Sequence, residues 1–176
     1  MTPVVTAATD ADLPGLADVA ARTFPLACPP SATPDNVAAF IAAHLSPARF
    51  AAYVADPARD VLVARDAGRV VGYAMLIDGV VDDPDVQRAV LTRPAAELSK
   101  MYVDPDAHGA GAASALMAAA LDAARERGAT AVWLGVNQEN ARAQRFYGKH
   151  GFTVSGTKTF RLGDGVESDY VMVRPL

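Results

Sequence analysis

The spacing of hydrophobic and polar positions changes several times along the chain, and each change marks the border of an expected element. Short apolar, β-rich runs predict strands at residues 4–7, 61–64, 70–77, 95–103, 130–136, 152–161 and 166–173. Helical spacing predicts helices at residues 10–22, 111–127 and 140–150, and two more within 34–57. This order departs from strict strand–helix alternation, which predicts a mixed α/β fold and not a doubly wound sheet.

Local turn signals place several of these borders. Thr33-Pro34 and Ser46-Pro47 each set a capping hydroxyl before a proline, which is typical of a helix start. Residues 66–69, Asp-Ala-Gly-Arg, predict a hairpin turn. The proline-rich residues 24–32 are expected to end the first helix, and residues 79–94 are expected to be an acidic connection with no clear pattern.

Composition favours one domain spanning residues 1–176, because 176 residues with 51% hydrophobic content suit a single core. The net charge of −4 disfavours nucleic acid as a partner. The chain shows neither a basic segment followed by an apolar run at its start nor a long apolar stretch. We therefore expect a cytoplasmic protein, monomer or homodimer, without a signal peptide or membrane partner. Cys28 is alone and the three histidines lack ligand spacing, so no metal site is expected.

Residues 102–114 combine a strand end, a turn, small residues and a helix start. Gly109 and Gly111 allow a ligand to approach the backbone, and the first N–H groups of a helix have no internal partners. These donors and the helix dipole favour an anion such as pyrophosphate. The alternative is a tight turn that needs no ligand. No Gly-Lys-Ser/Thr follows, so the loop is not a Walker motif.

This loop resembles the coenzyme A loop of the GNAT superfamily of acetyltransferases, which reads Gln/Arg-x-x-Gly-x-Gly/Ala. Gly111 and Ala113 match that pattern, and His108 replaces the usual Gln or Arg. The resemblance implies a mixed, mostly antiparallel central sheet of about seven strands, flanked by about four to five helices. It also implies acetyl-CoA as cosubstrate. The residues that it assigns to the cosubstrate in this region are Met101, Tyr102, Val103, His108, Gly109, Ala110, Gly111, Ala112, Ala113 and Ser114.

A second block fits the superfamily pattern Asn-x-x-Ala-x-x-Phe-Tyr-x-x-x-Gly-Phe, from Asn140 to Phe152. Positions 140, 143, 144 and 147 fall on one face of a helix. In the family, the Tyr protonates the departing coenzyme A thiolate and the Asn contacts the cofactor. The resemblance therefore assigns Tyr147 as the acid and Asn140 to the cofactor, and a phenol that is protonated at neutral pH suits this acid role. Lys149 is a further candidate contact for the phosphates. The alternatives are core packing for Tyr147 and a solvated charge for Lys149.

Glu97 is the candidate general base, because an amine with a pKa of about 10 must lose a proton before it attacks a thioester. It lies eleven residues before His108, the spacing of the glutamate base in the superfamily's histone acetyltransferases. Strand alternation predicts that Glu97, Met101 and Val103 share one face. The alternatives are a salt bridge at the strand end and a water relay that acts as the base.

Residues 160–172 resemble the tail of PaiA-type polyamine acetyltransferases. That resemblance implies a small primary amine as acceptor, with spermidine or spermine first. Direct attack in a ternary complex is expected, because Cys28 has no histidine near it in sequence. Acidic clusters at residues 82–85 and 164–169 could attract a polycation, and the favoured alternative is two solvated acidic turns. The alternatives are a protein acetyltransferase, acting on lysine or N-terminal amines, and a non-catalytic acyl-CoA sensor.

Overall fold

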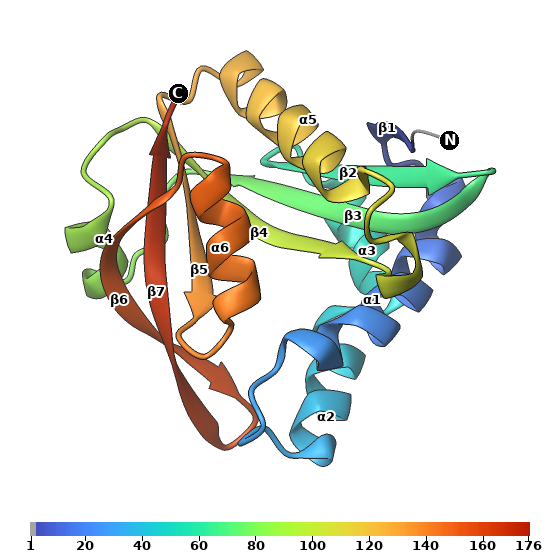
Figure 1. Ribbon diagram of the computed structural model, residues 1–176, viewed down its shortest axis with the longest axis horizontal. Helices are drawn as coiled ribbons and strands as arrows, with labels where there is room; N and C mark the ends of the chain where they lie inside the picture. Colours follow the sequence, from blue (N-terminus) through green and yellow to red (C-terminus); the bar gives the residue numbers. More distant parts are fainter. Residues whose placement is uncertain (1–2) are drawn as a thin grey trace.

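The computed structural model describes residues 3–176, and over that range seven strands form one sheet with helices on both faces (Figure 1). The spatial order of the strands is β1-β2-β3-β4-β5-β7-β6. The β4–β5 pair is parallel and the other pairs are antiparallel, which confirms the expected mixed sheet. The strand bounds are β1 Val4–Ala7, β2 Arg59–Asp66, β3 Arg69–Asp78, β4 Ala95–Val103, β5 Ala131–Asn137, β6 Thr153–Leu162 and β7 Gly165–Pro175.

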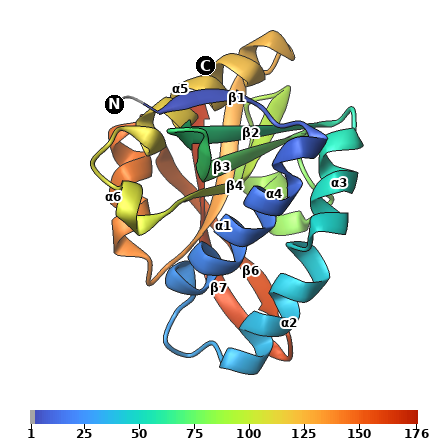
Figure 2. The ribbon, with the colours of Figure 1, turned by 90° about the vertical axis from the view of Figure 1, so that its right-hand side faces the viewer.

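Six α-helices cover this sheet within residues 3–176, one more than the expected upper number. Their bounds are α1 Leu13–Ala27, α2 Pro34–His44, α3 Pro47–Ala55, α4 Pro84–Ala89, α5 Ala112–Glu126 and α6 Ala141–Lys149. Helices α1, α2 and α3 pack on one face, whereas α5 and α6 pack on the other (Figure 2). No single helix in this range is long and apolar enough to cross a membrane. The α2–α3 pair, bent by 44°, meets those criteria only when its two helices are taken together.

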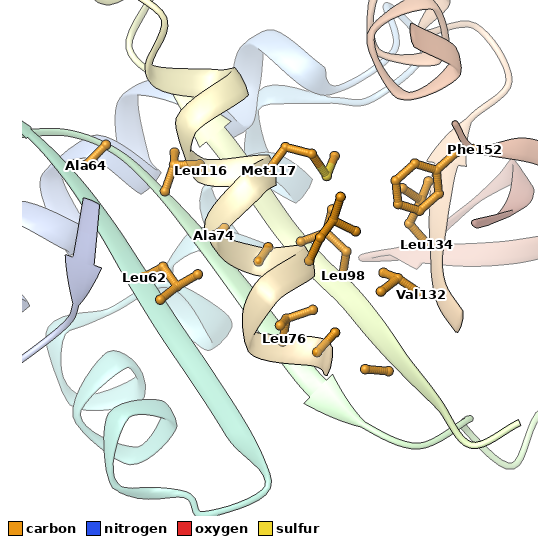
Figure 3. Close-up of a cluster of buried hydrophobic side chains, with 14 of the residues drawn as sticks. Leu62, Ala64, Ala74, Leu76, Leu98, Leu116, Met117, Val132, Leu134 and Phe152 are labelled. Carbon is orange, nitrogen blue, oxygen red and sulfur yellow. The ribbon is translucent and has the colours of Figure 1, made fainter. Parts of the chain in front are cut away.

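Each face of the sheet has its own buried cluster. Under α5, Leu116 lies in one cluster with Leu98 of β4 and Leu134 of β5 (Figure 3). On the opposite face, Phe50 of α3 packs against the ring of Tyr73 of β3, with ring centroids 5.4 Å apart. Because successive strand residues face opposite ways, both clusters draw on the same central strands.

The expected helix starts and hairpin turn are confirmed. Thr33 Oγ1 accepts a hydrogen bond from the Asn36 N–H at 3.1 Å, and Ser46 Oγ accepts one from the Arg49 N–H at 3.2 Å. The turn between β2 and β3 places Gly68 at a φ of 78°, a conformation that glycine adopts without strain.

Two expectations about elements are wrong. Helix α1 continues through Pro25 to Ala27, since a proline in the last turn removes one hydrogen bond but keeps a helical φ. Residues 84–89 form α4 where the sequence shows no clear pattern. Asp83 caps this helix by accepting a hydrogen bond from the Asp85 N–H at 2.9 Å. Six residues are too few for helical spacing to stand out.

Strand β4 contains a bulge that changes which side chains share a face. Its register against β3 shifts by one residue at Ser99. Leu98 lies before the bulge and packs under α5, and Met101 and Val103 beyond the bulge pack there too. Glu97 therefore faces the opposite side, toward α1. The expectation that Glu97 shares a face with Met101 and Val103 is wrong, because simple alternation does not survive an inserted residue.

Strands β4 and β5 separate after a short parallel contact. Only Ala95–Glu97 pairs with Ala131–Trp133. Beyond that point β4 continues along β3 and β5 continues along β7, and Figure 1 shows the two strands diverging. The second half of β4 consequently has one backbone edge without a strand partner, and this opening positions the site.

Candidate active site

The opening between β4 and β5 holds a cavity of about 570 Å³. Its walls come from α1, β4, β5, α6 and the β6–β7 hairpin. Glu97 and Tyr147, the two predicted catalytic residues, both line this cavity. The fold thus brings together two side chains that are distant in sequence.

Glu97 lies at the point where the two strands begin to separate, opposite Trp133. Its Oε2 atom is buried and has no hydrogen-bond partner among residues 3–176. Burial raises the pKa of the Glu97 carboxyl, while Lys158, Lys100 and Arg59 oppose that shift. Glu97 forms no salt bridge within the described residues, so the strand-end ion pair considered above is absent there. A buried acceptor without a partner costs about 1–3 kcal/mol of stability, so folding alone does not favour this residue here.

Tyr147 reaches the cavity from α6. Its ring packs against Phe146 and Phe152, with centroids 5.6 and 5.9 Å away. Burial raises the pKa of Tyr147 to about 12, so the phenol keeps its proton at neutral pH. The side chain therefore serves core packing through its ring and presents a protonated donor to the cavity.

The glycine loop before α5 has the geometry of an anion site. Gly109 and Gly111 have φ values of 87° and 86°, and a Cβ at either would meet nothing within 4 Å. Gly111 is the N-cap residue of α5, and no side chain within residues 3–176 caps this helix. The first N–H groups of α5 are therefore free to bind a phosphate-type ligand.

His108 connects this loop to α6. Its Nε2 lies 3.1 Å from the Val103 carbonyl oxygen, and its Nδ1 lies 2.5 Å from Arg142 Nη2. Because a guanidinium only donates, Nδ1 accepts and Nε2–H donates to the carbonyl. Sequence reasoning missed Arg142, which lines the cavity and places a positive charge beside this loop. Its position in the first turn of α6, two residues after Asn140, was the available signal.

The residues predicted to bind the cosubstrate divide into two groups. Those that line the cavity are Met101, Tyr102, Val103, His108, Ala113 and Asn140. Those that do not are Gly109, Ala110, Gly111, Ala112, Ser114 and Lys149, of which Ala112 is buried in the core and the others are exposed. Lys149 and Asn140 lie at opposite ends of α6. Asn140 also caps this helix, since its Oδ1 accepts a hydrogen bond from the Ala143 N–H at 3.1 Å.

The β6–β7 hairpin covers one part of the cavity by reaching α2 and the α1–α2 loop. Asn36 Nδ2 donates to Asp164 at 2.7 Å, and Ser31 Oγ donates to Glu167 at 3.1 Å. Figures 1 and 2 show the hairpin end beside α2 in both views. Segments from the two halves of the chain therefore enclose this part of the cavity.

Lys158 and Asp169 form an ion pair at 3.3 Å in the cavity wall. Burial raises the pKa of the Asp169 carboxyl, and Lys158 opposes that shift. A Cβ on Gly135 would lie 2.5 Å from Lys158 Cε, so the glycine leaves the space that Lys158 occupies. In the other acidic cluster, Asp83 caps α4 and Asp85 pairs with Arg88. Both clusters thus include acids with partners inside the protein.

The sequence matches the acetyltransferase (GNAT) family over residues 22–152. The chain belongs to the GNAT family of acetyltransferases. As a GNAT acetyltransferase it is an acyltransferase enzyme that uses acetyl-CoA, whose reactive group is an acetyl thioester. The open edge of β4, the free N–H groups of α5 and Arg142 are the parts that fit this cosubstrate.

Known GNAT proteins support this assignment along the whole chain. An uncharacterised N-acetyltransferase of Mycobacterium tuberculosis is 59% identical over 168 residues, which cover 96% of this chain and 99% of that one. The PaiA N-acetyltransferase of Thermoplasma acidophilum, solved in complex with coenzyme A, gives a TM-score of 0.78 at 19% identity and covers 100% of both chains. The ribosomal-protein-S18-alanine N-acetyltransferase of Escherichia coli gives 0.68 at 23% identity, covering 99% of this chain and 94% of that one. At these identities the two structures establish the fold.

Proposed function

We propose that this enzyme transfers the acetyl group of acetyl-CoA to the primary amine of a small molecule. The observation that carries the proposal is the cover that the β6–β7 hairpin forms over one part of the cavity. The contacts from Asn36 to Asp164 and from Ser31 to Glu167 tie the hairpin end to α2 and to the α1–α2 loop, and a cover held in this way leaves less room for a peptide chain than for a small amine. A protein acetyltransferase needs an open groove at this place.

Glu97 and Tyr147 take complementary roles in the proposed reaction. Glu97 accepts a proton from the acceptor ammonium, directly or through one water, because burial makes its carboxylate a stronger base. Tyr147 donates its proton to the departing thiolate, since the pKa of about 12 keeps the phenol protonated until sulfur carries charge. The phenolate then regains a proton from the nitrogen that becomes the amide, directly or through solvent. The open edge of β4 and the N-terminus of α5 hold the two ends of the cosubstrate.

We further propose that the acetyl group passes directly to the amine. Cys28 lines the cavity, but burial raises the pKa of its thiol to about 11. A thiolate is the nucleophilic form, so this cysteine is a poor acetyl acceptor at neutral pH. Its Sγ donates to the Phe24 carbonyl oxygen at 3.4 Å, which further favours the protonated form.

A parallel screen of acceptors tests the proposed function. Purified enzyme and acetyl-CoA are incubated with spermidine, spermine, other small amines and a lysyl peptide, and thiol release is recorded. We expect turnover with at least one small amine and little with the peptide. The sequence resemblance puts the polyamines first in this screen. Preference for the peptide would identify a protein acetyltransferase, and the absence of turnover with every amine would favour an acyl-CoA sensor.

The Tyr147→Phe variant tests the acid. The substitution keeps the ring that packs on Phe146 and Phe152 and removes only the hydroxyl, so folding and the KM for acetyl-CoA are expected to change little. With the best acceptor, kcat is expected to fall roughly 10²- to 10⁴-fold, the usual contribution of a general acid. Undiminished turnover would show that Tyr147 is not the general acid.

A further inference from the structure

Strand β4 presents one acid and one base to the same part of the cavity. The bulge at Ser99 puts Glu97 and Lys100 on the face toward α1, although they are three residues apart. The side chain that follows on this face, Tyr102, packs in the cluster of α1 to α3, which confirms the orientation. Glu97 and Lys100 both line the cavity.

Both groups lack a partner within residues 3–176. Lys100 forms no hydrogen bond or ion pair there, and Glu97 Oε2 has no hydrogen-bond partner. The two side chains are also farther apart than the 4.0 Å that defines an ion pair. Burial lowers the pKa of the Lys100 ammonium, while Glu97 opposes that shift. Lys100 is half-buried, so an anion bound beside its ammonium in the cavity would form a charge-assisted hydrogen bond with it.

The other charged groups in this part of the cavity are already engaged. Lys158 pairs with Asp169 at 3.3 Å, and Glu167 accepts a hydrogen bond from Ser31 at 3.1 Å. Glu97 and Lys100 are therefore the carboxylate and the ammonium here that have no hydrogen-bond or ion-pair partner within residues 3–176. A ligand that pairs with both side chains must carry an amine for the Glu97 carboxylate and an anionic group for the Lys100 ammonium. An amino acid has both groups.

Aromatic rings form the apolar part of the same wall. Phe24 and Phe40 stack with centroids 4.5 Å apart, Tyr102 meets the edge of Phe24 at 6.4 Å, and Phe160 meets Phe40 at 5.6 Å. All four line the cavity. Such a wall favours an apolar substituent through burial of its surface.

We propose that Lys100 binds the carboxylate of the acceptor and that the acceptor is an amino acid with an apolar side chain. This inference rests on the proposed function, because it takes Glu97 as the group that receives the amine proton. Lys100 is then the residue that selects the acceptor and Glu97 the residue that activates it. The aromatic wall holds the side chain between them.

The test compares L-phenylalanine with L-phenylalaninamide, which differ only in the carboxylate. The amide has the more readily deprotonated amine, so ionisation works against the expected preference. We expect kcat/KM for the acid to exceed that for the amide by about tenfold to a hundredfold, the range for a hydrogen bond to a charged partner. The Lys100→Met variant should lose this preference while its rate with the amide and its KM for acetyl-CoA persist. The Lys100→Arg variant should retain part of it.

Calorimetry of the same two compounds, with coenzyme A present, measures the carboxylate preference without turnover. Stronger binding of the acid that disappears in Lys100→Met supports the proposal even if catalysis fails. Equal or better use of the amide or of spermidine by the wild type overturns it, as does an equal loss for acid and amide in Lys100→Met. Turnover of spermidine without any carboxylate preference would leave the proposed acetyl transfer standing and refute only the role of Lys100.

Discussion

At the scale of single residues, burial shifts the pKa of Glu97 and of Tyr147 in the same direction, and the two shifts serve opposite purposes in the proposed reaction. It raises the pKa of the carboxyl, which makes the carboxylate a stronger base, and it raises the pKa of the phenol to about 12, which preserves an acid. Both effects require low solvent access at one cavity. Neither is visible from the residue types alone.

The Glu97→Gln variant tests the base through pH. In the wild type, kcat/KM is expected to rise with pH and to level off once Glu97 is deprotonated, at a pH above that for an exposed glutamate. The variant should be slower by roughly 10²- to 10⁴-fold and should lack that limb. A pH profile that is unchanged in the variant would assign the base elsewhere, for instance to a water relay.

Stability gives a second measure of the same group. The folded state holds the Glu97 proton more tightly than the unfolded chain, so the wild type loses stability as pH rises from the unfolded pKa of 4.5 through the raised folded value. Glutamine has no proton to lose. Urea unfolding across this window should therefore show the variant gaining stability relative to the wild type as pH increases. A constant difference between the two proteins would contradict the raised pKa.

At the scale of elements, the bulge in β4 and the glycine loop before α5 decide how this strand and this helix are used. The bulge turns Glu97 and Lys100 to one face while Met101 and Val103 remain in the core. The loop starts α5 without a side-chain cap, so the helix keeps its first donors for a ligand.

The Gly111→Ala variant tests the loop, and Gly68→Ala is its matched control. Both glycines have positive φ, 86° and 78°, and a Cβ at either meets nothing within 4 Å. Each substitution should therefore cost about 1 kcal/mol of stability through backbone strain alone. Only Gly111→Ala should also raise the KM for acetyl-CoA, by roughly threefold to tenfold, as misplaced N–H donors bind less well. The KM for acetyl-CoA and the unfolding curve are measured for both variants. Similar changes in KM would show that the loop does not bind the cosubstrate.

At the scale of the whole molecule, the site exists because the sheet opens where β4 leaves β5. Three residue pairs join the two strands, and the cavity begins at the last of them. The acceptor part is enclosed by α1 and α2 from one end of the chain and by the β6–β7 hairpin from the other. In the proposed function, this long-range closure favours a small acceptor over a peptide.

The sequence by itself determined the features that depend on neighbouring residues. Prolines after Thr33 and Ser46 placed two helix starts, and Gly109 and Gly111 marked the loop, because capping and backbone preference act over a few residues. The spaced block around Tyr147 identified the family for the same reason, since its helical face is a local pattern.

Only the tertiary structure decided which side chains meet. The bulge at Ser99 inverted the expected face of Glu97, and Lys100 and Arg142 acquired their positions in the cavity from strand register and helix packing. Helix α4 likewise buries Val86 and Ala89 in one cluster with Trp133 of β5. These features depend on contacts between segments far apart in the chain, which no local pattern of hydrophobic and polar residues encodes.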